Sequence, residues 1–303
     1  MAKEVQQMSL EKEFAKNTNI NREDIKQLRE WLKTQPHLPE KHVTDLDLVL
    51  AYHCCDRSSQ LAKDVLDLNL TSRTLITAIF GHREVSQKII EAARTATVYT
   101  LPEPDSTGTC YLYGGLLRLE PKYFFFADIL QLALMIFDLW QYENGTCPWF
   151  SIIIDLKGVA WAHITRIDLM TLRQLIYYLE EGVLVKIKHI HFLNAPSFID
   201  KFLALIKPLM KKELFEKIQV HTSDSPKAFN NIPKKGLPKE RGGEYMTGQE
   251  ISEYTIQRLN ANKKYFEVEN LNRINKSLRP SGKHSSIENV LGIQGSFKKL
   301  ELD

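Results

Sequence analysis

Histidine and cysteine are the residue types of this chain that could carry chemistry, and their spacing indicates which chemistry. His189 and His191 alternate along a strand-like segment, so both imidazoles point to one face and could form a metal-binding pair. No acidic third ligand follows at an informative spacing, which favours ordinary, partly exposed imidazoles at a strand end. We therefore expect no metal, no cofactor and no enzymatic activity. The other residues considered for catalysis are His163, His221, Asp155 and Cys147.

Sequence motifs of nucleotide binding and acyl transfer are missing. The chain contains no GxGxxG fingerprint, no phosphate-binding P-loop and no GxSxG nucleophile elbow. Four cysteines are present, two of them adjacent at 54 and 55, and none has CxxC spacing. This cysteine pattern is typical of a reducing compartment.

Composition indicates a soluble globular protein. The chain has 303 residues, of which 43% are hydrophobic and 25% charged, with a net charge of +3. The polar N-terminus has no apolar signal-peptide core, and the apolar stretch 129–137 is far shorter than the roughly 20 residues of a membrane span. We expect a cytoplasmic protein that contacts membranes only peripherally and transiently.

Hydrophobic periodicity predicts helices first and an α/β arrangement afterwards. Residues 1–97 read as a small all-helical domain, in which Asn21 caps one helix. Strand-like segments at 110–119, 149–155 and 183–193 alternate with helices at 124–142 and 171–181, which predicts βαβ crossovers in a mostly parallel sheet. Residues 260–286 look extended or mobile, and apolar residues in 290–302 predict a tail that packs back on the body.

The most unusual segment spans residues 186–217. It carries seven lysines against three acidic residues, a net +4 that exceeds the charge of the whole chain. Within it, Phe198, Phe202 and Leu205, followed by Ile206 and Leu209, recur at helical spacing. One interpretation is an ordinary amphipathic core helix, and the other is a lipid-facing helix with lysines placed for anionic headgroups.

Several motifs resemble the CRAL-TRIO lipid-binding family. The resemblance is carried by VKIKHIHFLNAP at 185–196, ALIKPLMKKEL at 204–214, IIDLKG at 153–158 and LPKERGG at 237–243. The tail GSFKKLELD at 295–303 is similar to the insect branch of proteins like α-tocopherol transfer protein. The motifs follow the family's order along nearly the whole chain.

The resemblance implies three regions: an N-terminal helical domain (1–97), an α/β lipid-binding domain (98–250) and a C-terminal extension (251–303). The family's pocket lies between a sheet floor and a movable gate helix, which matches residues 195–215 here. The gate residues implied to bind ligand are Phe198, Phe202, Leu205, Ile206 and Leu209. The remaining implied pocket residues are Phe126, Leu130, Leu134, Phe137, Phe150, Ile152, Ile154, Trp161, Ile167, Tyr178, Leu179, Val183, Val185, Ile187 and Ile190.

A basic phosphoinositide patch in the tocopherol-transfer branch matches this chain at three positions out of four. Lys186, Lys188 and Lys217 fit it, whereas the fourth position is Glu213, with Lys211 and Lys212 beside it. The resemblance thus implies binding to anionic lipid through Lys186, Lys188, Lys211, Lys212 and Lys217, without fixing a particular phosphoinositide. A second departure is Arg241, where the family usually has Tyr.

These observations predict a monomeric carrier that binds one hydrophobic molecule, such as a tocopherol, retinoid or carotenoid, and transfers it at anionic membranes. Nucleic acid is not expected as a partner, because aromatic stacking platforms do not accompany the lysines. Two alternatives remain: a phospholipid or phosphoinositide exchanger of the same fold, and a membrane or protein interaction module that transfers nothing. Candidates for the group that orients the ligand are Tyr111, Tyr113, Tyr178, His163 and Thr165.

Overall fold

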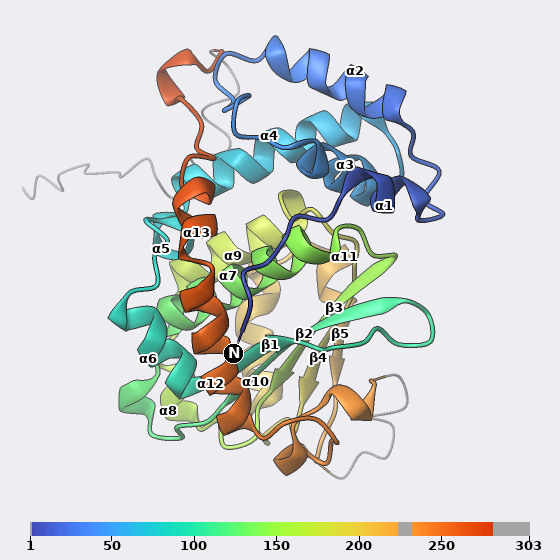
Figure 1. Ribbon diagram of the computed structural model, residues 1–303. Helices are drawn as coiled ribbons and strands as arrows, with labels where there is room; N and C mark the ends of the chain where they lie inside the picture. Colours follow the sequence, from blue (N-terminus) through green and yellow to red (C-terminus); the bar gives the residue numbers. More distant parts are fainter. Residues whose placement is uncertain (1, 224–231, 281–303) are drawn as a thin grey trace, which may run out of the picture.

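A mixed β-sheet with helices on both faces forms the body of the protein, and further helices from the N-terminus pack on one end (Figure 1). The computed structural model describes residues 2–223 and 232–280. The strands are β1 Ala96–Thr100, β2 Thr109–Leu116, β3 Trp149–Asp155, β4 Ile187–Leu193 and β5 Ile218–Val220. The helices are α1 Leu10–Ala15, α2 Arg22–Lys33, α3 Asp45–Cys54, α4 Ser59–Leu75, α5 Thr77–Phe80, α6 Gln87–Thr95, α7 Phe126–Asn144, α8 Trp161–Ile164, α9 Leu169–Glu181, α10 Ile199–Ile206, α11 Lys212–Phe215, α12 Gly248–Ala261 and α13 Lys263–Glu269.

The strand order explains why one face of the sheet is covered by three crossover helices. The order is β1-β2-β3-β4-β5, with β1 antiparallel to β2 and every other neighbouring pair parallel. Each parallel strand is added on the same side of the previous one, and right-handed crossovers then place all connecting helices on one face. Helices α7, α9 and α10 therefore share a face, and the predicted α/β class with a mostly parallel sheet is confirmed.

The N-terminal helices start at capping residues that the sequence displays. The Asn21 side chain accepts a hydrogen bond from the Asp24 N–H at 3.0 Å, and Thr44 caps α3 in the same way. Leu28, Leu32 and Leu48 form the core between these helices. Further along the same region, the long α4 is followed by the single turn of α5.

Two short strands were not predicted from the sequence. β1 follows α6 without an intervening glycine or proline, and its first two residues fall in the region 1–97 that was predicted to be helical. β5 has three residues, too few for a periodicity. The predicted strand at 110–119 is observed as β2, which runs through both of its glycines. Gly115 is required by a close approach, since a Cβ there would lie 2.9 Å from the Tyr113 Oη.

The C-terminal helices are held on the body beside α6 and β1, as Figure 1 shows. Ser252 of α12 donates a hydrogen bond to the Ala93 carbonyl at 2.6 Å, and Thr255 donates to the Val98 carbonyl at 3.1 Å. Phe266 of α13 is fully buried, so the expectation of an extended or mobile 260–286 segment is wrong for its first part. The predicted packing of 290–302 lies outside the described residues.

The predicted domain boundaries fall inside elements of the structure. The boundary at residue 97 lies within β1, and the boundary at residue 250 lies within the first turn of α12. The division into three regions stays a prediction.

A buried ion cluster joins the beginning, middle and end of the described chain. Arg73 of α4 forms a two-pronged pair with Asp138 of α7, at 2.8 and 2.9 Å, and its Nη1 lies 2.9 Å from Glu269 of α13. Arg83 reaches the same Asp138 carboxylate at 2.6 Å. Burial opposes ionisation, but the two guanidinium groups outweigh it and lower the pKa of Asp138 to about 2.

Candidate ligand-binding cavity

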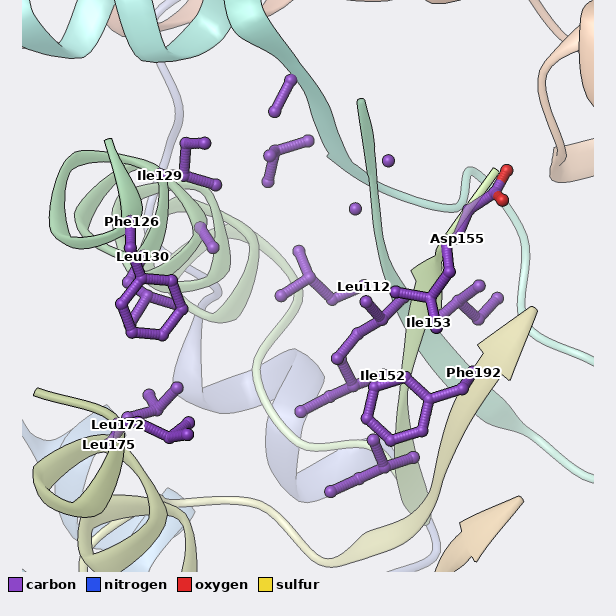
Figure 2. A pocket seen from close by; sticks show the side chains of 18 of the residues that line it. Leu112, Phe126, Ile129, Leu130, Ile152, Ile153, Asp155, Leu172, Leu175 and Phe192 are labelled. Carbon is purple, nitrogen blue, oxygen red and sulfur yellow. The ribbon is translucent and has the colours of Figure 1, made fainter. Parts of the chain in front are cut away.

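An apolar cavity of about 300 Å³ lies between the sheet and the crossover helices. Pockets for drug-sized ligands span roughly 300–1,000 Å³, so this volume suits one small hydrophobic molecule. Side chains of α7 and α9 face those of the sheet across the space in Figure 2, namely Phe126, Ile129, Leu130, Leu172 and Leu175 opposite Leu112, Ile152 and Phe192. The long apolar α7 and the buried strand β3 thus supply two opposing walls.

Most of the residues implied by the family resemblance lie in this wall. Sixteen of the twenty line the cavity: Phe126, Leu130, Leu134, Phe137, Phe150, Ile152, Ile154, Ile167, Leu179, Val183, Val185, Ile187, Ile190, Phe198, Phe202 and Ile206. Their contact with a ligand stays a prediction.

Tyr178 and Trp161 lie outside the wall, for different reasons. Tyr178 sits on the side of α9 that faces the N-terminal helices, where its ring meets Phe80 edge-on and its hydroxyl accepts a hydrogen bond from Asn69 at 3.3 Å. Trp161 is 45% exposed and packs its ring against Phe198 at 5.5 Å, on the outside of the cavity. The sequence pattern gives polarity and periodicity, but not which side of a helix meets the cavity.

The gate segment 195–215 is not one helix. α10 ends at Ile206, a 3₁₀ turn follows over Lys207–Leu209, and α11 begins at Lys212. Pro208 has no N–H to continue the hydrogen-bond ladder and its ring clashes with the preceding turn, which explains the break. Leu209 is therefore rotated out of the expected stripe, and Leu205 is 42% exposed on the outer face, so neither lines the cavity.

Other wall residues were not predicted from the sequence, although helical spacing could have identified some of them. Ile129 and Ala133 neighbour the predicted Phe126 and Leu130 at helical spacing on α7, and helix faces are continuous. The further wall residues include Ala96, Val98, Leu112, Leu116, Phe124, His163, Ile164, Leu172, Leu175, Ile176, Phe192, Ile199, Met210 and Ile218. Those from β1 could not be found without knowing that β1 exists.

Tyr113 and Asp155 belong to strands that line the cavity, but their side chains point to the other face of the sheet, where Tyr113 packs against Tyr99 and Ile153. The Tyr113 hydroxyl donates to Asp155 at 2.7 Å, Arg241 Nε lies 3.0 Å from the same carboxylate, and Asn194 donates to it at 2.8 Å. Burial, then the Asp155 charge, raises the pKa of Tyr113, which stays protonated. Because Asn194 directly precedes the gate, this cluster holds the chain just before the gate begins, and Arg241 has a charged partner in Asp155.

Two further polar candidates already have partners elsewhere. Tyr111 lies on the opposite face of the sheet, where its hydroxyl donates to Asp105 at 2.8 Å. The Thr165 hydroxyl donates to the Ala162 carbonyl at 3.1 Å at the end of α8. Neither residue lines the cavity.

The five predicted anionic-lipid lysines form two groups, each with partners inside the chain. Lys186 pairs with Asp56, Lys188 donates to the Thr107 and Thr109 hydroxyls at 2.9 and 3.0 Å, and Lys217 donates to the Ile187 carbonyl at 2.7 Å. These three lie together where β4 and β5 begin. Lys211 pairs with Glu181, whose hydrogen bond raises the pKa of Lys211, and Lys212 lies 3.7 Å from Glu216.

The histidines first considered as a metal pair lie on the sheet face opposite the cavity. His191 Nδ1 is 3.3 Å from His221 Nε2, and His189 lies beside Gln219. Within residues 2–223 and 232–280, no group of three or more His, Cys, Asp or Glu side chains is placed to hold a metal ion. No helix in the same ranges is long and apolar enough to cross a membrane.

An apolar cavity on a mixed sheet, lined in part by the segment between the parallel strands β4 and β5, characterises this α/β protein. Comparison with known families identifies the class to which it belongs. Residues 94–243 match the CRAL/TRIO domain, and residues 17–90 match the Pinta-like UBA domain. The chain belongs to the CRAL-TRIO family.

Individual relatives are distant. Alpha-tocopherol transfer protein-like from Homo sapiens is 29% identical over 116 residues, which cover 38% of this chain and 34% of that protein. Clavesin-2 from Rattus norvegicus is 28% identical over 117 residues, covering 39% and 35%. These matches span about a third of the length of either relative. The crystal structure of Sfh5 aligns with 79% of this chain and 98% of its own at 13% identity, but its TM-score of 0.44 is too low to support a conclusion.

Proposed function

We propose that this protein is a carrier, and not an enzyme, that holds one hydrophobic small molecule in its cavity and transfers it at anionic membranes. The observation that carries the proposal is the apolar cavity itself. Each 100 Å² of apolar ligand surface removed from water contributes about 2.5 kcal/mol, so a wall of aliphatic and aromatic side chains is sufficient to bind a lipid. The name of the tocopherol-transfer relative is consistent with such cargo.

Release requires that the gate moves. Phe198, Phe202 and Ile206 of the gate line the cavity, so opening exposes them. That exposure is unfavourable in water and much less so against a bilayer, which couples opening to membrane contact. Leu205 of the gate and the neighbouring Trp161 are already exposed and provide the first apolar contact with the bilayer.

In this proposal, lysine side chains cause the protein to bind anionic membrane surfaces in preference to neutral ones. A lysine near such a surface contributes about 1 kcal/mol of attraction. Lys186, Lys188 and Lys217 lie together, but their hydrogen bonds within the chain must rearrange or be shared, so we expect less than three times that value. Glu213 is exposed beside Lys212, and we propose general attraction to anionic lipid rather than recognition of one phosphoinositide.

Vesicle transfer of a pyrene-labelled fatty alcohol tests the proposal. Lys→Gln at 186, 188 and 217 should lower the transfer rate to phosphatidylserine vesicles about 10-fold and leave the affinity for the probe within twofold. The matched control is Lys→Gln at Lys12, Lys26 and Lys33, which removes the same charge from α1 and α2 and should transfer normally. Equal rates for the two triple variants would remove the lysine cluster from the proposal, and no transfer by the unaltered protein would refute carriage.

A further inference from the structure

The loop between β2 and α7, residues 117–125, carries large apolar side chains on the molecular surface. Leu119 is 51% exposed, Tyr123 is 37% exposed and Phe125 is 56% exposed. No phenylalanine, tyrosine or tryptophan among the described residues is more exposed than Phe125. Exposed apolar residues that gather in one place mark surfaces that bind a partner or a membrane.

The residues on either side of Phe125 point inward. Phe124 and Phe126 line the cavity, and Phe125 does not. The backbone of Phe125 is extended, with φ −103° and ψ 98°, and successive side chains of an extended chain point to opposite sides. The same short stretch is therefore cavity wall on one side and molecular surface on the other.

Cationic side chains lie over the exposed rings. Lys122 Nζ is 4.7 Å from the centre of the Tyr123 ring, and the Arg166 guanidinium is 5.9 Å from the centre of the Phe125 ring. Arg166 Nε also donates to the Phe124 carbonyl at 3.3 Å, which ties the end of α8 to the loop. Aromatic rings beside lysine and arginine are typical of the headgroup level of a bilayer, where apolar parts sink and charges stay in water.

The surface around the loop is positively charged. Gly158 brings the segment 157–166 against Leu119, since a Cβ on this glycine would lie 2.6 Å from the Leu119 Cδ2. The cations of the two segments are Arg118, Lys122, Lys157 and Arg166, and the one acid is Glu120. Arg118 pairs with Glu91 at 3.0 Å, which leaves three cations against one acid. A bilayer with anionic headgroups therefore matches both the apolar residues and the charge.

This surface lies at the opposite end of the sheet from the lysine cluster. The loop follows the carboxyl end of β2, and the gate begins after the carboxyl end of the parallel strand β4. Lys186, Lys188 and Lys217 lie instead at the amino ends of β4 and β5. β3 between them has seven residues, so the two surfaces are about 20 Å apart. A bilayer that lies along the gate can meet one surface at each end.

Resting on the proposed carrier function, we infer that the 117–125 loop is a docking surface for anionic bilayers. Phe125 is its apolar anchor, and Lys122 and Arg166 are its charged contacts. Insertion of Phe125 moves Phe124 and Phe126 with it, so contact with the bilayer reaches the cavity wall directly. The loop is separate in sequence from the gate and the lysine cluster, so its contribution can be removed by itself.

Co-sedimentation with vesicles that contain phosphatidylserine tests the anchor. Phe125 is the N-cap of α7, where serine is favourable, so Phe125→Ser should melt no lower than the unaltered protein. It should bind the vesicles about 10-fold more weakly and keep its affinity for pyrene within twofold. The control is Leu61→Ser on α4, whose side chain is also 56% exposed and whose removal should leave vesicle binding unchanged. Equal binding by the two variants would overturn the inference and leave carriage of a hydrophobic molecule standing.

The charged contacts are tested on two kinds of vesicle. Lys122→Gln combined with Arg166→Gln should lower binding to phosphatidylserine vesicles about 10-fold and leave binding to pure phosphatidylcholine vesicles unchanged. Lys→Gln at Lys12 and Lys26 removes the same charge from α1 and α2 and should have no effect on either. A loss of the same size on both kinds of vesicle would contradict the electrostatic part of the inference.

A tryptophan at the anchor position reports insertion directly. Phe125→Trp keeps an aromatic anchor, so vesicle binding should stay within twofold, and the emission of the added indole should move to shorter wavelength on vesicles. Leu61→Trp should bind equally well without that change. An indole at 125 whose emission ignores bound vesicles would contradict the bilayer as occupant and favour a protein partner. Failure of the unaltered protein to bind any vesicle would refute this docking surface together with transfer at membranes, whereas failure to bind pyrene would refute carriage.

Discussion

Two consecutive stretches of α7 have opposite surroundings. From Phe126 to Phe137 the helix carries side chains such as Leu130 and Leu134 into an apolar cavity. One residue further on, Asp138 lies in a cluster of buried charges shared by Arg73 and Glu269. Removing the partner of a buried charge is costly, whereas apolar surfaces have no directional bonds to lose. The comparison teaches that the stretch around Asp138 is fixed, whereas the cavity-lining stretch can accept and release a ligand in the proposed function.

Removing the anion at the centre of the ion cluster should have the largest effect. Asp138→Asn leaves Arg73 and Arg83 buried without their shared charge, which should lower the free energy of unfolding by about 3–5 kcal/mol in urea titrations at pH 7. The pKa of Asp138 in the folded protein, about 2, lies below its unfolded value of about 3.9, so this stabilisation is full above pH 4 and is lost as the pH falls through 2. The two proteins should therefore converge in stability in strong acid.

Its control is an exposed ion pair. Glu30→Gln on α2 removes a pair with Lys33 in which both side chains are more than half exposed, and should leave the free energy of unfolding nearly unchanged. A loss at Asp138 no greater than that at Glu30 would show that the cluster does not fix this stretch of α7.

The same substitution, alanine to leucine, can be made once in the packed core and once in the cavity wall. Ala93 of α6 is fully buried in packed core, and Ala93→Leu should cost about 1–3 kcal/mol through overpacking. Ala133 of α7 lines the cavity, so Ala133→Leu should change stability by less than about 1 kcal/mol while weakening pyrene binding at least fivefold. Thermal melts and fluorescence titration measure the two effects. Equal destabilisation by both substitutions would mean that the space beside Ala133 cannot take extra atoms.

The helices and strands that were predicted correctly are those indicated by residues within the element itself. β3 appears at Trp149–Asp155 as expected, because a short β-branched run bounded by polar residues admits few other structures. α2 begins at its Asn21 cap, and α7 follows its long apolar run. The wall residues of these elements were found for the same reason.

Features that depend on distant partners were not predictable. Pro208 alone could have predicted the break in the gate helix. The strong apolar periodicity around it favoured one continuous helix instead. Arg241 looked like an unexplained departure until Asp155, far away in the chain, proved to be its partner. His163 could be named as a polar candidate, but only the structure shows that it is buried in the cavity wall while Tyr111 and Thr165 lie elsewhere.

Native mass spectrometry of the purified protein, after incubation with a cellular lipid extract, tests the central claim most directly. We predict a species carrying one lipid molecule per chain, released on denaturation, and a reduced fraction of this species for Ala133→Leu. Detection of the bare chain alone, under conditions that preserve other non-covalent complexes, would contradict the account.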